Sequence, residues 1–128
     1  MTKQIIHTTA APAAVGPYSQ AVSTTATRTV FLSGQIGLSP ETGELVESSF
    51  EAQVKQAFEN MVAVIKASDA NLNDIVKLTL YLTDLNNFSK VNEMMSSVIP
   101  EPFPARSTVQ VSGLPKGAAF EVEAILAL

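Results

Sequence analysis

The residues best suited to chemistry in this chain lie in two short segments near its carboxyl end. Phe103-Pro104-Ala105-Arg106-Ser107 opens a run with strand character, and Glu121-Val122-Glu123 follows it. Arg106 is one of only two arginines, and a guanidinium at the end of a strand presents a rigid fork of donors that fits a carboxylate or phosphate at two points. On residue type alone a structural salt bridge is the commoner use of such an arginine, so an anion site needs support from the rest of the chain.

Glu121 and Glu123 share one face of the last strand that the pattern predicts, because side chains alternate between the two faces of a strand. The residues between and beside them are apolar and point to the other face. An acidic pair in this position is usually exposed to solvent. Where the outer face of a strand lines a boundary between subunits, however, one glutamate could serve as a general base. Glu121 is the candidate base, and Glu123 is the nearest alternative.

Other kinds of catalytic site have little support in the sequence. The chain has no cysteine and a single histidine, His7 near the amino end, which argues against a catalytic triad, a thiolate nucleophile and a metal site. Ser107 lacks a histidine that would activate it. No phosphate-binding glycine loop is present. Gly34, at the end of a predicted strand, marks either a bulge or a close approach of backbone to a ligand.

The composition predicts one domain over residues 1–128. The net charge of -4 and the scattered lysines argue against nucleic acid as the main partner. With 46% hydrophobic and 16% charged residues, the chain is more apolar than a soluble monomer requires, which favours a homo-oligomer. The lack of cysteine, of a secretion signal and of a long apolar stretch leads us to expect a soluble cytoplasmic protein.

Two segments have the apolar spacing of helices. The first covers residues 50–66; a capping box from Ser48 to Glu51 would begin it, and Asp69, which tolerates the left-handed conformation, would end it. The second is expected to follow a cap at Asp84 and to stop at Pro100.

Five further segments have the pattern of strands: 21–23, 29–33, 75–82, 107–111 and 120–126. Within 75–82 the alternation places Val76, Leu78, Leu80 and Leu82 on one face. The order of the elements is strand, strand, helix, strand, helix, strand, strand. It predicts an α+β fold in which two helices pack on one face of a mixed sheet.

Seven segments along the chain resemble the signatures of the reactive intermediate deaminase family, the RidA or YjgF-type proteins. In order, they are Gly16-Pro17-Tyr18-Ser19-Gln20, Ser33-Gly34-Gln35-Ile36, Asp74-Ile75-Val76-Lys77, Asp84-Leu85-Asn86-Asn87-Phe88, Val91-Asn92, Phe103-Pro104-Ala105-Arg106-Ser107 and Glu121-Val122-Glu123-Ala124. The resemblance extends over nearly the whole chain.

This resemblance implies a chorismate-mutase-like α+β fold, assembled as a homotrimer with three sites in the clefts between subunits. It also implies hydrolysis of enamine and imine intermediates, such as 2-aminoacrylate and 2-iminobutanoate, to 2-oxo acids and ammonia. Pyridoxal-phosphate enzymes such as serine and threonine dehydratases release these intermediates. The family enzyme uses no cofactor and no metal, which is chemically reasonable because an imine already carries a polarised carbon.

The resemblance also implies roles for particular residues. Arg106 would hold the substrate carboxylate, and Glu121 would position or activate water for attack at the imine carbon. Tyr18, from a neighbouring subunit, would line the cleft, and Gly34 and Asn92 would shape it. The backbone at Thr108 would contact the ligand.

The chain departs from the family pattern in three places. Thr108 stands where many members have cysteine, Met95 replaces an aromatic residue, and the connection over residues 100–102 is shorter than in some members. These differences bear on substrate preference more than on reaction type. A rival interpretation is a non-catalytic trimeric module that senses 2-oxo acids; it would use Arg106 but would not need Glu121. Some members have been described as ribonucleases or translation inhibitors, a function that the acidic composition argues against.

Overall fold

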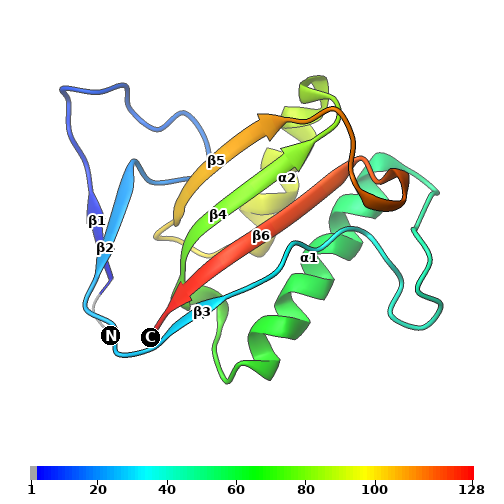
Figure 1. Ribbon diagram of the computed structural model, residues 1–128. Coiled ribbons are helices and arrows are strands. Elements are labelled where there is room, and N and C mark those ends of the chain that lie inside the picture. Colours follow the sequence, from blue (N-terminus) through cyan, green and yellow to red (C-terminus); the bar gives the residue numbers. More distant parts are fainter. Residues whose placement is uncertain (1–2) are drawn as a thin grey trace.

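A computed structural model describes residues 3–128 and shows a four-stranded sheet with two helices behind it and a two-stranded ribbon at one side (Figure 1). In spatial order the sheet consists of β3 (Thr29–Phe31), β6 (Phe120–Ala127), β4 (Ile75–Leu82) and β5 (Ala105–Gln110). β4 runs parallel to β5 and antiparallel to β6, which is itself antiparallel to β3. The predicted mixed sheet is therefore confirmed.

The helices α1 (Phe50–Ala67) and α2 (Phe88–Val98) cover the same face of this sheet (Figure 1). Their apolar stripes, which include Phe58 and Met95, are fully buried against the inward side chains of β4 and β6. The rings of Phe58 and Phe120 lie 5.7 Å apart at the centre of this layer. This confirms the predicted α+β arrangement, and no element of the described residues covers the other face of the sheet, which we call the open face.

The helix ends differ slightly from the prediction. The N-cap of α1 is Ser49, whose side chain accepts a hydrogen bond from the Ala52 backbone N–H at 3.0 Å, so the expected capping box from Ser48 is wrong by one residue. The helix is followed by Asp69 with a φ of 55°, as predicted. Asp84 caps a short 3-10 turn (Leu85–Asn87), and α2 itself begins only at Phe88.

The strand β4 also departs from simple alternation. Its register against β6 shifts between Ile75 and Lys77, so Ile75 is fully buried whereas Val76, which we expected on the apolar face, is only partly buried. Beyond this bulge the alternation of Leu78, Leu80 and Leu82 is as predicted. The strand β5 begins at Ala105 rather than at 107, which places Arg106 inside the sheet.

The amino-terminal strand β1 (Lys3–Ile6) was not predicted. It pairs antiparallel with β2 (Ala21–Thr24) in the separate ribbon, and the Lys3 Nζ donates to the backbone oxygens of Ile75 and Pro102 at 3.1 Å each. Burial lowers the pKa of Lys3, while the charge of Asp74 acts in the opposite direction. The loop between β1 and β2 passes close to β5, where it contributes to the site. Neither helix of the described chain is both long and apolar enough to cross a bilayer.

Candidate functional site

Arg106 lies on the helix-covered side of β5, because it is in register with the buried Leu78 of β4. Its Nη1 donates to the Asn92 Oδ1 of α2 at 2.6 Å and lies 3.6 Å from the Met95 sulfur. The ion pairs among residues 3–128 are Lys55–Glu59 and Lys90–Glu51, so the guanidinium has no carboxylate partner in the described chain. Arg106 therefore forms no structural salt bridge among the residues that the structure describes.

Two aromatic rings contact the guanidinium. Its central carbon lies 4.8 Å from the centre of the Tyr18 ring and 5.2 Å from that of Phe88. Such cation–π contacts stabilise and orient the charge. Burial lowers the pKa of Arg106, and the nearby Tyr18 acts in the opposite direction, but a guanidinium stays charged at any physiological pH. The result is a partly buried cation, fixed in orientation, that can accept an anion.

A hollow of about 220 Å³ opens beside this cation. It is lined by Arg106 with Val15, Tyr18, Phe88 and Thr108. The Thr108 Oγ1 is buried and has no hydrogen-bond partner among the described residues. The size and the charge of this hollow suit a small carboxylate.

The loop before β2 places Tyr18 at this hollow. The Ser19 N–H donates to the Pro104 oxygen at 2.9 Å, next to β5. The Gln20 side chain closes the loop, because it donates to the Pro12 oxygen and accepts from the Thr8 N–H, both at 2.7 Å. Tyr18 therefore lies against the Arg106 of its own chain, and its expected place in a cleft between subunits stays a prediction.

Glu121 lies on the open face of the sheet, in register with Tyr81 of β4. The segment that contains Gly34 runs beside it, held by the Gln35 N–H to Val122 oxygen bond of 2.8 Å. A Cβ at Gly34 would lie 2.5 Å from the Glu121 Oε2, so only glycine leaves room for the carboxylate there. Burial, and secondly the charge of Glu123, raise the pKa of Glu121. A carboxylate with a raised pKa is a stronger base near neutral pH.

One chain does not bring Arg106 and Glu121 together. β4 separates their strands, and the two side chains point to opposite faces of the sheet. Of the other residues singled out in the sequence, Tyr18, Asn92 and Thr108 lie with Arg106, whereas Gly34 lies with Glu121. Within residues 3–128 no three His, Cys, Asp or Glu side chains cluster as a metal site requires.

Sequence reasoning did not assign roles to two residues of these clusters. Phe88 stacks on Arg106, and the only signal for it was its place in one of the segments that resemble the family. Tyr81 hydrogen-bonds to Glu123, and the alternation in its strand predicted only that it would face away from the core.

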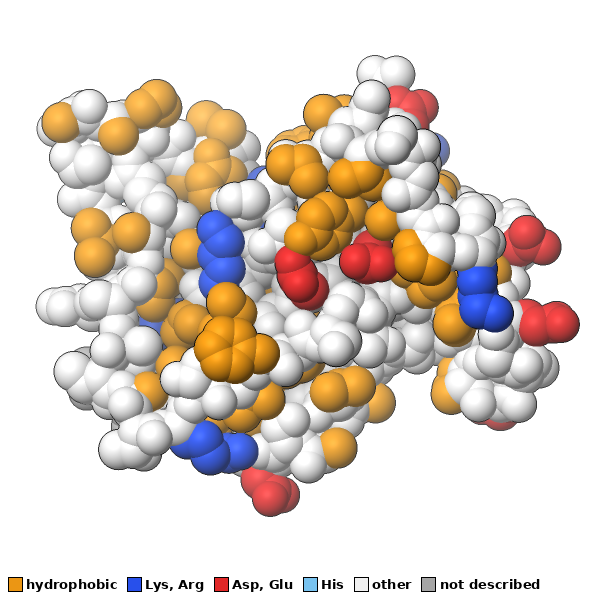
Figure 2. Space-filling model, in the orientation of Figure 1, with side chains coloured by type: hydrophobic (Ala, Val, Ile, Leu, Met, Phe, Trp, Pro, Cys, Tyr) orange, Lys and Arg blue, Asp and Glu red, His pale blue; other side chains and the backbone are white. Residues whose placement is uncertain are grey.

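The open face that carries Glu121 is partly apolar. Figure 2 shows acidic side chains near the middle of this face, with apolar and basic ones around them. Phe31 of β3 and Val109 of β5 lie on this face and are 74% and 42% exposed. A second copy of the chain could cover them.

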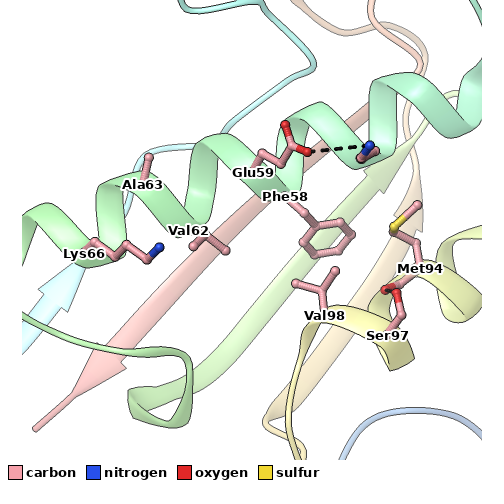
Figure 3. Close-up of a pocket in the computed structure, with 9 residues that line it drawn as sticks. Phe58, Glu59, Val62, Ala63, Lys66, Met94, Ser97 and Val98 are labelled. Atoms are coloured by element: carbon pink, nitrogen blue, oxygen red, sulfur yellow. Dashed lines mark hydrogen bonds and ion pairs between the residues drawn. The ribbon is translucent and has the colours of Figure 1, made fainter.

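A larger hollow, of about 560 Å³, lies elsewhere, between α1 and α2 (Figure 3). Its floor is apolar, with Phe58, Val62, Met94 and Val98, and its rim carries the Lys55–Glu59 pair at 4.0 Å. It contains neither Arg106 nor Glu121. It is therefore not the candidate site.

Comparison with known proteins gives concordant matches. The model of the family described as Endoribonuclease L-PSP matches residues 8–128. The 2-iminobutanoate/2-iminopropanoate deaminase of Mus musculus is 44% identical over 123 residues, which are 96% of this chain and 90% of that protein.

Two solved structures show the same fold. The crystal structure of RidA from the Antarctic bacterium Psychrobacter sp. PAMC 21119 is 50% identical, with a TM-score of 0.76, and the match covers 98% of this chain and 99% of the other. The crystal structure of E. coli TdcF with bound serine is 38% identical, with a TM-score of 0.71, and the match covers 98% of both chains.

Proposed function

The chain belongs to the Endoribonuclease L-PSP family, which includes the reactive intermediate deaminases, and we propose from this premise that it hydrolyses 2-iminobutanoate, 2-iminopropanoate and enamines such as 2-aminoacrylate to 2-oxo acids and ammonia. The observation that carries the proposal is the partly buried Arg106, which is oriented by two rings and an amide and has no carboxylate partner among residues 3–128. Such a cation fits the carboxylate that all these substrates share.

The chemistry follows from the charges of the two clusters. Arg106 binds the substrate carboxylate and fixes the imine carbon in position. Glu121 takes a proton from a water molecule, whose oxygen attacks that carbon, and the same proton is passed on to the imine nitrogen. Collapse of the resulting carbinolamine forms the C=O bond of the 2-oxo acid and breaks the C–N bond, so ammonia leaves. The reaction needs no cofactor and no metal.

In this proposal the protein is a cytoplasmic homotrimer, and Arg106 of one subunit faces Glu121 of the next across a cleft. Two observations support a shared site. One chain holds the two residues on opposite faces of its sheet. The open face also exposes Phe31 and Val109, which an assembly would cover. Light scattering should give about three times the 13.6 kDa of one chain, and a monomeric mass would contradict both the trimer and the shared site.

A coupled assay tests the reaction. A threonine dehydratase generates 2-iminobutanoate, and formation of 2-oxobutanoate is followed with and without the protein. We expect the protein to accelerate this step in proportion to its concentration. An unchanged rate, together with calorimetric binding of 2-oxobutanoate, would instead support the rival function, a module that senses 2-oxo acids.

Subunit mixing tests the shared site directly. Arg106→Ala and Glu121→Gln trimers, each inactive, are unfolded together and refolded as an equal mixture. In a cyclic trimer every mixed assembly has one boundary with both intact residues, so about one quarter of the wild-type activity should return. No recovery from correctly sized mixed trimers would show that both residues act from the same chain.

A further inference from the structure

Three side chains form a connected group on the open face of the sheet. Glu121 and Glu123 are two residues apart on β6, which places their Cα atoms roughly 7 Å apart. Tyr81 of β4 is in register with Glu121, but its hydroxyl donates a hydrogen bond to the Glu123 Oε1. Diagonal neighbours across an antiparallel pair are within reach of an aromatic side chain. The Tyr81 side chain therefore extends from the position of one glutamate to the carboxylate of the other.

Among residues 3–128 no cation forms an ion pair with either of the two carboxylates. Lys77, on the same face of β4, donates to the Ser107 hydroxyl of β5 at 3.2 Å and forms no ion pair within the described residues. Thr79 is the residue in register with Glu123, and the segment around Gly34 that packs on Glu121 is uncharged. The fixed partner of the Glu123 carboxylate in the described chain is thus the Tyr81 hydroxyl.

The Glu123 carboxylate contributes to the raised pKa of both Tyr81 and Glu121. The hydrogen bond to Glu123 is the main cause that raises the pKa of Tyr81, and the charges of Glu123 and Glu121 add to it. The charge of Glu123 is the second cause, after burial, of the raised pKa of Glu121. Tyr81 therefore holds the Glu123 carboxylate in a fixed place beside Glu121.

We propose that Tyr81 and Glu123 are a positioning pair for Glu121: Tyr81 fixes the Glu123 carboxylate, and the fixed charge sets the pH range in which Glu121 works as a base. This inference rests on the proposed deaminase function. Neither residue needs to touch the substrate. The pair acts on Glu121, whereas Arg106 of the next subunit is proposed to hold the substrate carboxylate, so the pair should affect the pH dependence of turnover and leave carboxylate binding unchanged.

The sign of the effect follows from the electrostatics. While Glu123 is charged, the Glu121 carboxyl keeps its proton to a higher pH, so kcat/KM falls off on the acid side at a higher pH than it would otherwise. Glu123→Gln removes the charge. The acid limb, which is the part of the pH profile where kcat/KM falls as Glu121 gains a proton, should then shift to lower pH by about 0.5–1 pH unit. Tyr81→Phe frees the carboxylate to turn into water, so the limb should move in the same direction by a smaller amount.

The experiment is a double-mutant cycle of Tyr81→Phe and Glu123→Gln in the coupled assay, with full pH profiles of kcat and KM. Because Tyr81 acts through Glu123, Tyr81→Phe should shift the limb in the wild-type background and add nothing in the Glu123→Gln background. KM should stay constant. Glu47→Gln, which removes an exposed carboxylate of the loop before α1, is the matched control and should leave the profile unchanged.

Two outcomes would overturn the inference: an acid limb that Glu123→Gln does not move, or an equal effect of Tyr81→Phe in both backgrounds. Unfolding midpoints and light scattering on each variant identify one that fails to fold or assemble. Carbon NMR of the labelled Glu121 carboxyl measures the same shift without turnover. If the wild type lacks deaminase activity, the proposed function fails while this titration still decides whether the pair controls Glu121.

Discussion

The Arg106 cluster and the Glu121 cluster are built in different ways on the same sheet. Arg106 is enclosed by two rings, an amide and a methionine sulfur, on the side covered by α2. Glu121 lies on the open face, against a glycine, and its neighbours are a tyrosine and a second glutamate. A permanent charge needs mainly a fixed orientation, whereas a base has to meet water and exchange protons.

Burial acts on both clusters but in opposite directions. It lowers the pKa of Arg106 and raises the pKa of Glu121, because in each case it disfavours the charged form. The cation keeps its charge and gains attraction for an anion, while the carboxylate gains affinity for a proton. In the proposed reaction one chain thus carries a binding half around Arg106 and a catalytic half around Glu121, and both must face one cleft.

The largest expected effect comes from the catalytic half. Glu121→Gln keeps the shape of the side chain but cannot take a proton from water, so kcat should fall by about 100- to 10,000-fold. Calorimetric binding of 2-oxobutanoate should stay near the wild-type value, because Arg106 is unchanged. Normal turnover of this variant would move the base to another residue, with Glu123 the nearest.

The binding half should respond less strongly and in a different parameter. Arg106→Lys keeps the charge but loses the planar two-point contact, so kcat/KM should fall by roughly 10- to 100-fold. Arg28→Lys is the matched control, since Arg28 is exposed and donates to the Ser68 oxygen at 2.8 Å, far along the chain from both clusters. If Arg106→Lys turns over as fast as the wild type, the carboxylate contact is not made by this residue.

Local sequence signals were sufficient for most of the fold. Apolar spacing located α1 and β4, and the paired glutamates on an otherwise apolar strand located the open face. These sequence signals failed to locate one helix cap, where two serines are adjacent, and one strand that is too short to show alternation. Ser49 rather than Ser48 caps α1, and β1 has only four residues with no alternation.

The site was harder to predict, because it depends on how distant strands align. Residue type identified Arg106 and Glu121, but no local pattern shows that β4 lies between their strands or that they point to opposite faces. The contact of Tyr18 with its own Arg106 likewise depends on a loop that is tied to the start of β5. Tyr81 could be recognised only from the register of β4 on β6.

A smaller effect should follow from crowding the catalytic carboxylate. Gly34→Ala would place a Cβ 2.5 Å from the Glu121 Oε2 and 2.7 Å from its Cδ, so the carboxylate must move. Since these atoms are the flexible end of a side chain, the free energy of unfolding should fall by only about 1 kcal/mol. The value of kcat should fall by roughly tenfold. Gly113→Ala meets no atom within 4 Å and is the matched control. Unchanged kcat would show that the position of the carboxylate is not critical.

The smallest effect is expected in the binding half, at Thr108. Its hydroxyl is buried without a partner in the described chain, so Thr108→Val should leave the unfolding free energy unchanged or raise it by about 1 kcal/mol. KM should also stay constant, because we expect the backbone at this position, and not the hydroxyl, to contact the ligand. Thermal unfolding and steady-state kinetics measure the two quantities. A several-fold rise in KM at unchanged stability would show instead that the hydroxyl contacts the ligand beside Arg106, and the binding half would then contribute a hydrogen bond as well as a charge.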